Sequence, residues 1–155
     1  MNQIHIEVQM ENVSLEKIER ERVENTICQT LALAGEKNNI GGKEVGVCVT
    51  DNGHIRKLNR KYRNKDKATN ILAFPSDTPD YLGDLLISWE KIGEEAEVQK
   101  KKPCHHLAHI ALHGLLHLIG FDHKQKSEAE KMERMEIAIL GELGIENPYR
   151  DERIL

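Results

Sequence analysis

Hydrophobic and polar residues alternate along short stretches of the chain, which is typical of strands with one buried face. The alternation is clearest at residues 4–8 and 45–49, where every second residue is Ile or Val. Two further apolar runs, residues 71–74 and 82–87, are short and are separated by a loop of turn-forming residues at 76–80. We therefore predict a small sheet of four strands.

Longer segments repeat apolar residues every three or four positions, which is the period of an amphipathic helix. Helices are predicted over residues 14–35, 51–63, 88–101, 103–120 and 127–143. Ser14 and Ser88 are predicted to cap the start of two of these helices, and Asp51 or Asn52 caps another. Pro103 suits the first turn of the helix that it begins.

The order of these elements predicts the fold class. Strands and helices are mixed and their connections are short, so we expect an α+β fold in which a small mixed four-stranded sheet packs with about five helices. The most apolar helix, at 103–120, is expected to be central and to lie against the sheet. A fully parallel doubly wound sheet is less expected, because strands and helices do not alternate strictly. No repeat, linker or second domain is evident, which predicts a single domain over residues 1–155.

Composition narrows the class of protein. The formal net charge of −4 argues against a general coat for nucleic acid, although it allows a local basic patch. Cys28, Cys48 and Cys104 form no C-x-x-C pair and are interpreted as small buried residues in a reducing compartment. No apolar run approaches the roughly 20 residues of a membrane span, and residues 1–7 lack the features of a signal peptide. We expect a cytoplasmic protein that has no membrane partner.

The predicted central helix carries a polar stripe of histidines, at His105, His106, His109, His113 and His117. His113 and His117 are four residues apart, which places their Cβ atoms about 6 Å apart on one helix face. Two imidazoles in that position can share a zinc ion at about 2.1 Å each. Gly120 can end the helix in the left-handed conformation, so that the chain reverses and His123 returns as a third ligand. Three imidazoles leave the fourth position open, which is the layout of a catalytic zinc site.

The spacing H-x-x-x-H-x-x-G-x-x-H is the ligand spacing of the metzincin metalloproteases. The expected architecture is therefore zincin-like, with the metal ligands on the central helix. Metzincins have Glu immediately after the first histidine as general base, and here that position is Gly114. Because Gly114 cannot accept a proton, a zinc peptidase is the weaker interpretation.

Residues 113–123, read as HGLLHLIGFDH, resemble the H-G-x-L-H-L-x-G-x-D-H signature of the YbeY family. The family consists of bacterial single-strand-specific endoribonucleases that act as rRNA maturation factors. The resemblance implies that His113, His117 and His123 are the ligands of one zinc ion per chain. It also implies single-stranded RNA, rRNA in particular, as the substrate.

A dense basic segment precedes the third predicted strand. Seven Lys and Arg side chains lie within residues 56–67, and only Asp66 opposes them. This pattern favours a phosphate-binding surface, although a solvated helix face is the usual explanation of such a cluster. Residues 58–75 resemble the second motif of the same family, which places the family's functional arginine at Arg63. Ala68 and Ala73 depart from that motif, in which Pro and Ser are usual.

Together these residues predict metal-assisted hydrolysis of a phosphodiester. Zinc would activate water or polarise a phosphoryl oxygen, and Arg63 would hold the phosphate with its planar donors. His109 could contact substrate or carry a proton, and Asp122 could act as a base or orient a histidine ligand. The general base stays open.

The predicted function is that of a zinc-dependent endoribonuclease acting in rRNA 3'-end maturation and ribosome quality control. Its expected partners are single-stranded RNA and the ribosome or small-subunit assembly proteins, as the family resemblance implies. One alternative is a zinc metallopeptidase-like hydrolase. The other is a non-catalytic ribosome assembly factor, which the three-ligand set disfavours because structural zinc sites have four protein ligands.

Overall fold

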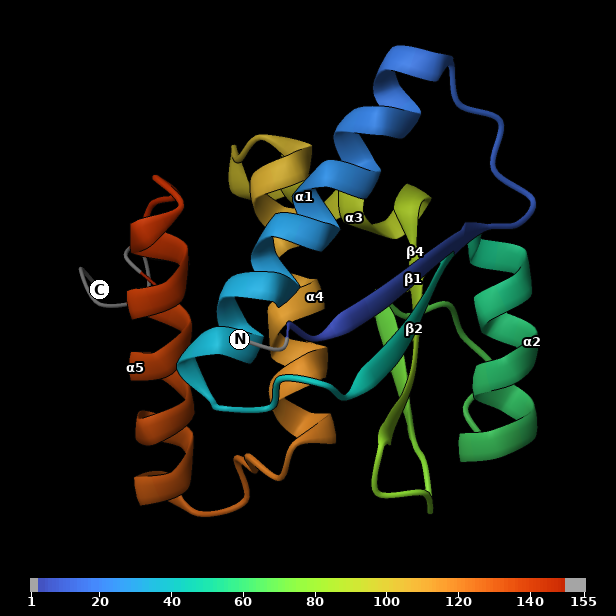
Figure 1. Cartoon of the computed structure of the whole chain (residues 1–155). Helices are drawn as coiled ribbons and strands as arrows, with labels where there is room; N and C mark the ends of the chain where they lie inside the picture. The colour runs from blue at the N-terminus through green and yellow to red at the C-terminus, as the bar shows by residue number, and fades with distance from the viewer. Residues whose placement is uncertain (1–2, 150–155) are drawn as a thin grey trace.

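The computed structural model describes residues 3–149 and shows an α+β fold built on one mixed sheet (Figure 1). The strands are β1 (His5–Met10), β2 (Glu44–Thr50), β3 (Ile71–Pro75) and β4 (Tyr81–Ser88), in the sheet order β1-β2-β4-β3. β1, β2 and β4 are parallel, and β3 is antiparallel to β4 at one edge. The predicted fold class and its mixed four-stranded sheet are confirmed.

Five helices accompany this sheet within the described residues. They are α1 (Lys17–Lys37), α2 (Asn52–Arg63), α3 (Trp89–Gln99), α4 (Pro103–Leu118) and α5 (Lys126–Glu142). None of them is long and apolar enough to cross a membrane. Residues 1–2 and 150–155 of the predicted domain lie outside the described part of the chain.

Two of the three predicted N-cap residues, Asp51 and Ser88, do cap their helices. The side chain of Asp51 accepts a hydrogen bond from the backbone N–H of His54 at 2.9 Å, and that of Ser88 accepts one from Lys91 at 3.2 Å. The prediction for Ser14 was wrong, because α1 begins only after the extended residue Glu16 and has no side-chain cap. Its first turn is therefore satisfied by other means than a Ser oxygen.

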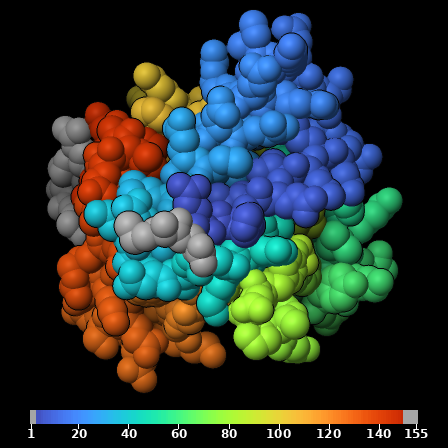
Figure 2. Space-filling view, in the orientation of Figure 1, coloured from blue at the N-terminus to red at the C-terminus, as the bar shows by residue number. Residues whose placement is uncertain are grey.

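The two faces of the sheet are covered by different helices. α1, α4 and α5 lie on one side, where inward residues of β2 and β4 such as Val47 and Ile87 join the main core (Figure 1). α2 lies on the other side, where Ile55 packs with Leu72 and Leu86 in a smaller cluster. In the space-filling view of the same orientation, α1 and β1 cover most of the visible face and hide much of α4 (Figure 2).

Helix α4 occupies the centre of the main core, as predicted. It contacts α1, α3 and α5 and lies against β3 and β4. Its apolar residues, among them Leu107, Leu112 and Leu115, are fully buried. Of its histidines, His106 is buried, whereas His105, His109, His113 and His117 are partly exposed on a helix that the core holds in place.

Candidate metal centre and groove

The three predicted ligands lie together at the C-terminal end of α4. His113 and His117 project from successive turns of the helix, which ends at Leu118. Gly120 then adopts a left-handed φ of 109°, and the backbone N–H of Phe121 bonds to the carbonyl of Leu116 at 2.9 Å. The chain turns there and brings His123 back. One ligand atom from each of the three imidazoles lies within 4.8 Å of the others.

The orientation of the rings fits a metal ion. The Nδ1 atom of His117 faces the carbonyl oxygen of Phe121 at 3.1 Å, and Nδ1 of His113 faces the Glu136 carboxylate at 3.0 Å. Each ring therefore donates its Nδ1–H outward and turns its Nε2 lone pair inward, and the two Nε2 atoms are 3.2 Å apart. Tetrahedral zinc with bonds of about 2.1 Å separates its ligand nitrogens by about 3.4 Å. This distance between the two Nε2 atoms is close to the one that a shared zinc ion requires.

The protonation of His117 favours the same arrangement. Burial lowers the pKa of its imidazole, and the neighbouring His113 and His123 lower it further. The neutral ring that results is the form of histidine that binds a metal. The donor set is therefore suited to a borderline ion such as Zn²⁺, which takes three imidazoles readily.

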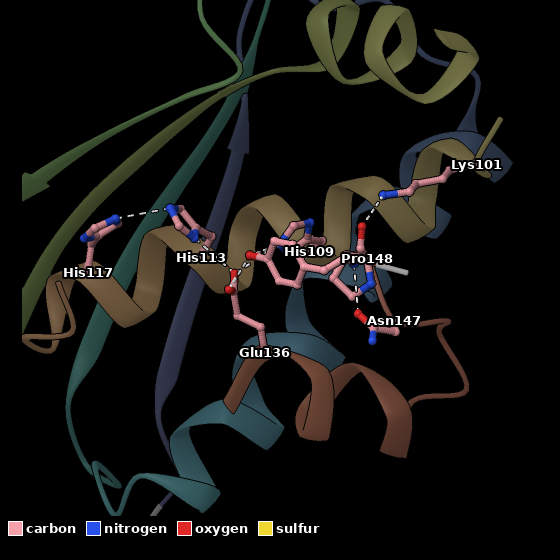
Figure 3. A network of polar contacts seen from close by, with 8 residues as sticks. Lys101, His109, His113, His117, Glu136, Asn147 and Pro148 are labelled. Atoms are coloured by element: carbon pink, nitrogen blue, oxygen red, sulfur yellow. Dashed lines mark hydrogen bonds and ion pairs between the residues drawn. The ribbon is translucent and has the colours of Figure 1, made fainter. Parts of the chain in front are cut away.

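The side chain of Glu136 reaches from α5 to His113 and His109 of α4 (Figure 3). Its carboxylate is fully buried and accepts hydrogen bonds from His113 Nδ1, from His109 Nε2 at 3.1 Å and from the Tyr149 hydroxyl at 2.6 Å. Burial would raise the pKa of Glu136, but hydrogen bonds from His109, His113 and Tyr149 lower it to about 2. The group is thus a carboxylate that fixes the ring of a ligand, as is usual for metal-binding histidines.

Sequence reasoning missed both Glu136 and Tyr149. One signal was present for Glu136, because it lies four residues from Met132 and from Leu140 and so shares their buried helix face. A lone acid on such a face needs a partner in the core. No comparable signal marked Tyr149, which reaches Glu136 only through the folding of the segment after α5.

The three histidines line a groove with a volume of about 900 Å³. One side, here called the histidine wall, consists of His109, His113, His117 and His123. A second part of the lining, here called the arginine wall, consists of Tyr62 and Arg63 at the end of α2 together with strand β3. Arg63 is exposed and lines the same groove as the histidines. Ala73, which differs from the Ser usual in the family's second motif, also lies on this wall. A Ser at this position would have added a hydroxyl to the groove.

The other two predicted catalytic residues, His109 and Asp122, differ in whether they line the groove. His109 lines the groove one turn before His113, with its Nε2 directed at Glu136. Asp122 is not among the residues that line the groove, and its carboxylate accepts the backbone N–H of His123 at 2.7 Å. Asp122 therefore shapes the loop that presents His123.

Gly114, the position of the metzincin glutamate, faces the sheet. A Cβ atom placed there would lie 2.5 Å from Ile71 Cδ1 and 2.9 Å from Leu85 Cδ2. The close approach of α4 to β3 and β4 thus leaves no room for a glutamate side chain. The peptidase alternative is weakened by packing as well as by the chemistry of glycine.

Fold and site define an α+β protein with a three-histidine candidate metal centre on its central helix. The chain belongs to the YbeY family, because the family's sequence model, described as Endoribonuclease YbeY, matches residues 6–144. An endoribonuclease is a hydrolase, so the family and the enzyme class predicted from the sequence are confirmed.

Individual relatives agree with this assignment. Endoribonuclease YbeY of Rhodopseudomonas palustris is 47% identical, in an alignment that covers 70% of this chain and 62% of that protein. Its counterpart in Bradyrhizobium sp. is 40% identical, with 85% of each chain covered. The solution structure of a Thermotoga maritima protein superposes with a TM-score of 0.61 at 25% identity, covering 89% of this chain and 91% of that one.

Proposed function

We propose that this chain is a zinc-dependent endoribonuclease that cleaves single-stranded RNA. The observation that carries the proposal is the groove in which three imidazoles converge and which Arg63 also lines. His113, His117 and His123 would hold the ion, and bound there it would supply Lewis-acid polarisation of a phosphoryl oxygen. This set of groups suits a phosphodiester, which carries negative charge and gains more as it reacts.

Arg63 is the proposed phosphate-binding residue. Its guanidinium is always charged and presents donors that match two phosphate oxygens. Its backbone lies at the last turn of α2, next to the left-handed Asn64 that ends the helix. The side chain can thus bind a phosphate in the groove that the three histidines line.

His109 and Asp122 have supporting roles in this proposal. Because His109 donates its Nε2–H to Glu136, its ring is held at the edge of the groove, where it can contact the substrate. Asp122 acts through the loop that positions His123. Neither geometry identifies the general base.

The preference for single strands is supported by aromatic side chains at the groove. Tyr62 is 59% exposed and stands edge-on to Phe74, with ring centroids 5.5 Å apart. Tyr149 lines the same groove. Unpaired bases can stack on such rings, whereas the bases of a duplex are already stacked on one another. From the family resemblance we further propose rRNA 3'-end maturation and ribosome quality control in the cytoplasm, with small-subunit assembly proteins as partners.

The test combines metal analysis with cleavage assays on the purified full-length chain. We expect one zinc ion per chain, cleavage of labelled single-stranded RNA, loss of cleavage with a chelator, and recovery when zinc is restored. Duplex RNA of the same sequence and casein serve as comparison substrates, which test the preference for single strands and the peptidase alternative. Chelator-sensitive cleavage of casein would instead support the peptidase. Full zinc content without cleavage of any RNA would support the non-catalytic assembly factor.

A further inference from the structure

A second hollow lies at the opposite end of α4 from the metal ligands. It has a volume of about 460 Å³ and is formed by the loop before α4, the first turns of α4 and the segment that follows α5. Lys100, Lys101 and Lys102 line it from the loop, and Pro148 lines it from the C-terminal segment. None of the predicted metal ligands borders this hollow.

The charge of the hollow favours an anion. Lys101 donates a hydrogen bond to the carbonyl of Pro148 at 3.2 Å, which joins the two sides of the hollow, while Lys100 and Lys102 are exposed. α4 begins here without a side-chain cap, so the positive end of its dipole adds to the lysine charges. One acid, Glu146, also lines the hollow, and the balance of charge remains positive.

Unmet hydrogen-bonding capacity is concentrated beside the same hollow. Among residues 3–149, the buried side-chain polar atoms without a hydrogen-bond partner are Asn59 Oδ1, His106 Nδ1 and His109 Nδ1. Both histidines line the hollow, and His106 is only 4% exposed. Burial lowers the pKa of His106, whose Nε2 faces Glu95 at 2.8 Å. Its Nδ1 is therefore an acceptor, and a hydroxyl is the kind of group that would satisfy it.

The hollow lies next to the candidate active groove, because His109 lines both. Figure 3 shows Lys101, His109, His113 and His117 in this order along one side of α4. Arg63 lines the same groove as the last two, so the groove and the hollow both carry positive charge. An RNA strand that leaves the cluster along α4 therefore reaches the lysines.

We infer that this hollow is a second RNA subsite, which binds the phosphate and ribose of a nucleotide flanking the one at the histidine cluster. Lys100 and Lys102 contact the phosphate, and the ribose hydroxyls face the Nδ1 atoms of His106 and His109. The inference rests on the proposed endoribonuclease function and specifies how that enzyme holds its substrate. The subsite contributes to binding of the strand and takes no part in the chemical step.

The test uses the full-length double variant Lys100→Gln/Lys102→Gln, which leaves Lys101 and its bond to Pro148 intact. The matched control, Lys17→Gln/Arg20→Gln, removes the same charge from exposed positions on α1. Binding of labelled single-stranded RNA is measured by fluorescence anisotropy over a range of salt concentrations, with a chelator present so that the strand stays intact. Cleavage kinetics are measured separately with the zinc-loaded proteins.

Loss of two phosphate contacts should reduce the slope of log K against log salt by about 1.4, and affinity at low salt by on the order of tenfold. We expect KM for long RNA to rise and kcat to stay unchanged, with the control close to wild type. Unchanged affinity and slope in the double variant, or an equal loss in the control, would overturn the subsite while leaving the activity intact. Lysine-dependent binding without cleavage by wild type would overturn the activity and leave the subsite in place.

Discussion

The two walls of the groove differ in how they are built. The helical part of the histidine wall is anchored to the core: His113 and His109 bond to the fully buried Glu136, and His117 bonds to the backbone of Phe121, whereas His123 is exposed. Arg63, on the arginine wall, is exposed and, within residues 3–149, forms no hydrogen bond or ion pair with another side chain. One wall has a fixed geometry, and the other ends in a long side chain that is free to move.

This difference corresponds to the tasks proposed for each wall. A metal site needs donor atoms placed to within a few tenths of an ångström, which requires ligands locked by packing and hydrogen bonds. A phosphate contact tolerates adjustment, because guanidinium and phosphate can meet in several bidentate arrangements. Substitutions on the histidine wall should therefore change metal binding, and substitutions on the arginine wall should change only the handling of RNA.

The largest effect is expected from His117→Ala. Removing one of three imidazoles leaves too few ligands to hold the ion, so zinc content should fall from one per chain to near zero and cleavage to background. His5→Ala, at an exposed position on β1, is the matched control. Metal analysis beside circular dichroism separates loss of the ion from loss of the fold. Full zinc occupancy in the variant would contradict the assigned ligand set.

Arg63→Ala should have the next largest effect. The loss of a group that stabilises charge in the transition state lowers kcat/KM by about 10²–10³, and zinc content should stay at the wild-type level. Arg60→Ala removes an equal charge from the same helix and serves as control. Arg63→Lys should recover only part of the activity, because an ammonium cannot form the bidentate contact. A loss of zinc in Arg63→Ala would contradict the expectation that the arginine wall takes no part in metal binding.

A smaller effect is expected from Glu136→Gln. The amide keeps the shape of the side chain but replaces one acceptor oxygen with a donor, so it cannot accept from His109, His113 and Tyr149 together. Zinc affinity should fall by about 10–100-fold. Competition with a chelator measures this affinity, and Glu130→Gln at an exposed position on α5 is the control. Unaltered affinity would show that Glu136 serves folding alone.

The smallest effect concerns the contact between α4 and the sheet. Gly114→Ala forces Ile71 and Leu85 to shift, whereas Gly93→Ala in α3 meets no atom within 4 Å. Both substitutions raise helix propensity equally, so the difference in their free energies of unfolding isolates the packing cost. It should be about 1–3 kcal/mol, measured by urea denaturation. Equal stabilities would mean that the position of α4 tolerates a side chain at Gly114.

Much of the histidine wall was predictable because its parts are close in the chain. His113 and His117 meet through helix geometry alone, and Gly120 allows the reversal that returns His123. The helical wheel did not show that His106 would instead face Glu95 of α3, because that depends on how two helices pack. The contact of Glu136 with His113 joins residues 23 apart and was missed for the same reason.

By itself the sequence determined the order of strands and helices and the spacing of the histidines, and its resemblance to the family motifs predicted a role for Arg63. Local periodicity and helix geometry are properties of neighbouring residues, so they can be deduced from the chain alone. Only the tertiary structure decided that the end of α2 lines the same groove as the histidines of α4, that Glu136 supports the candidate ligands, and that a lysine-lined hollow lies next to the groove at His109. These features depend on contacts between distant segments, and such contacts exist only once the core has packed.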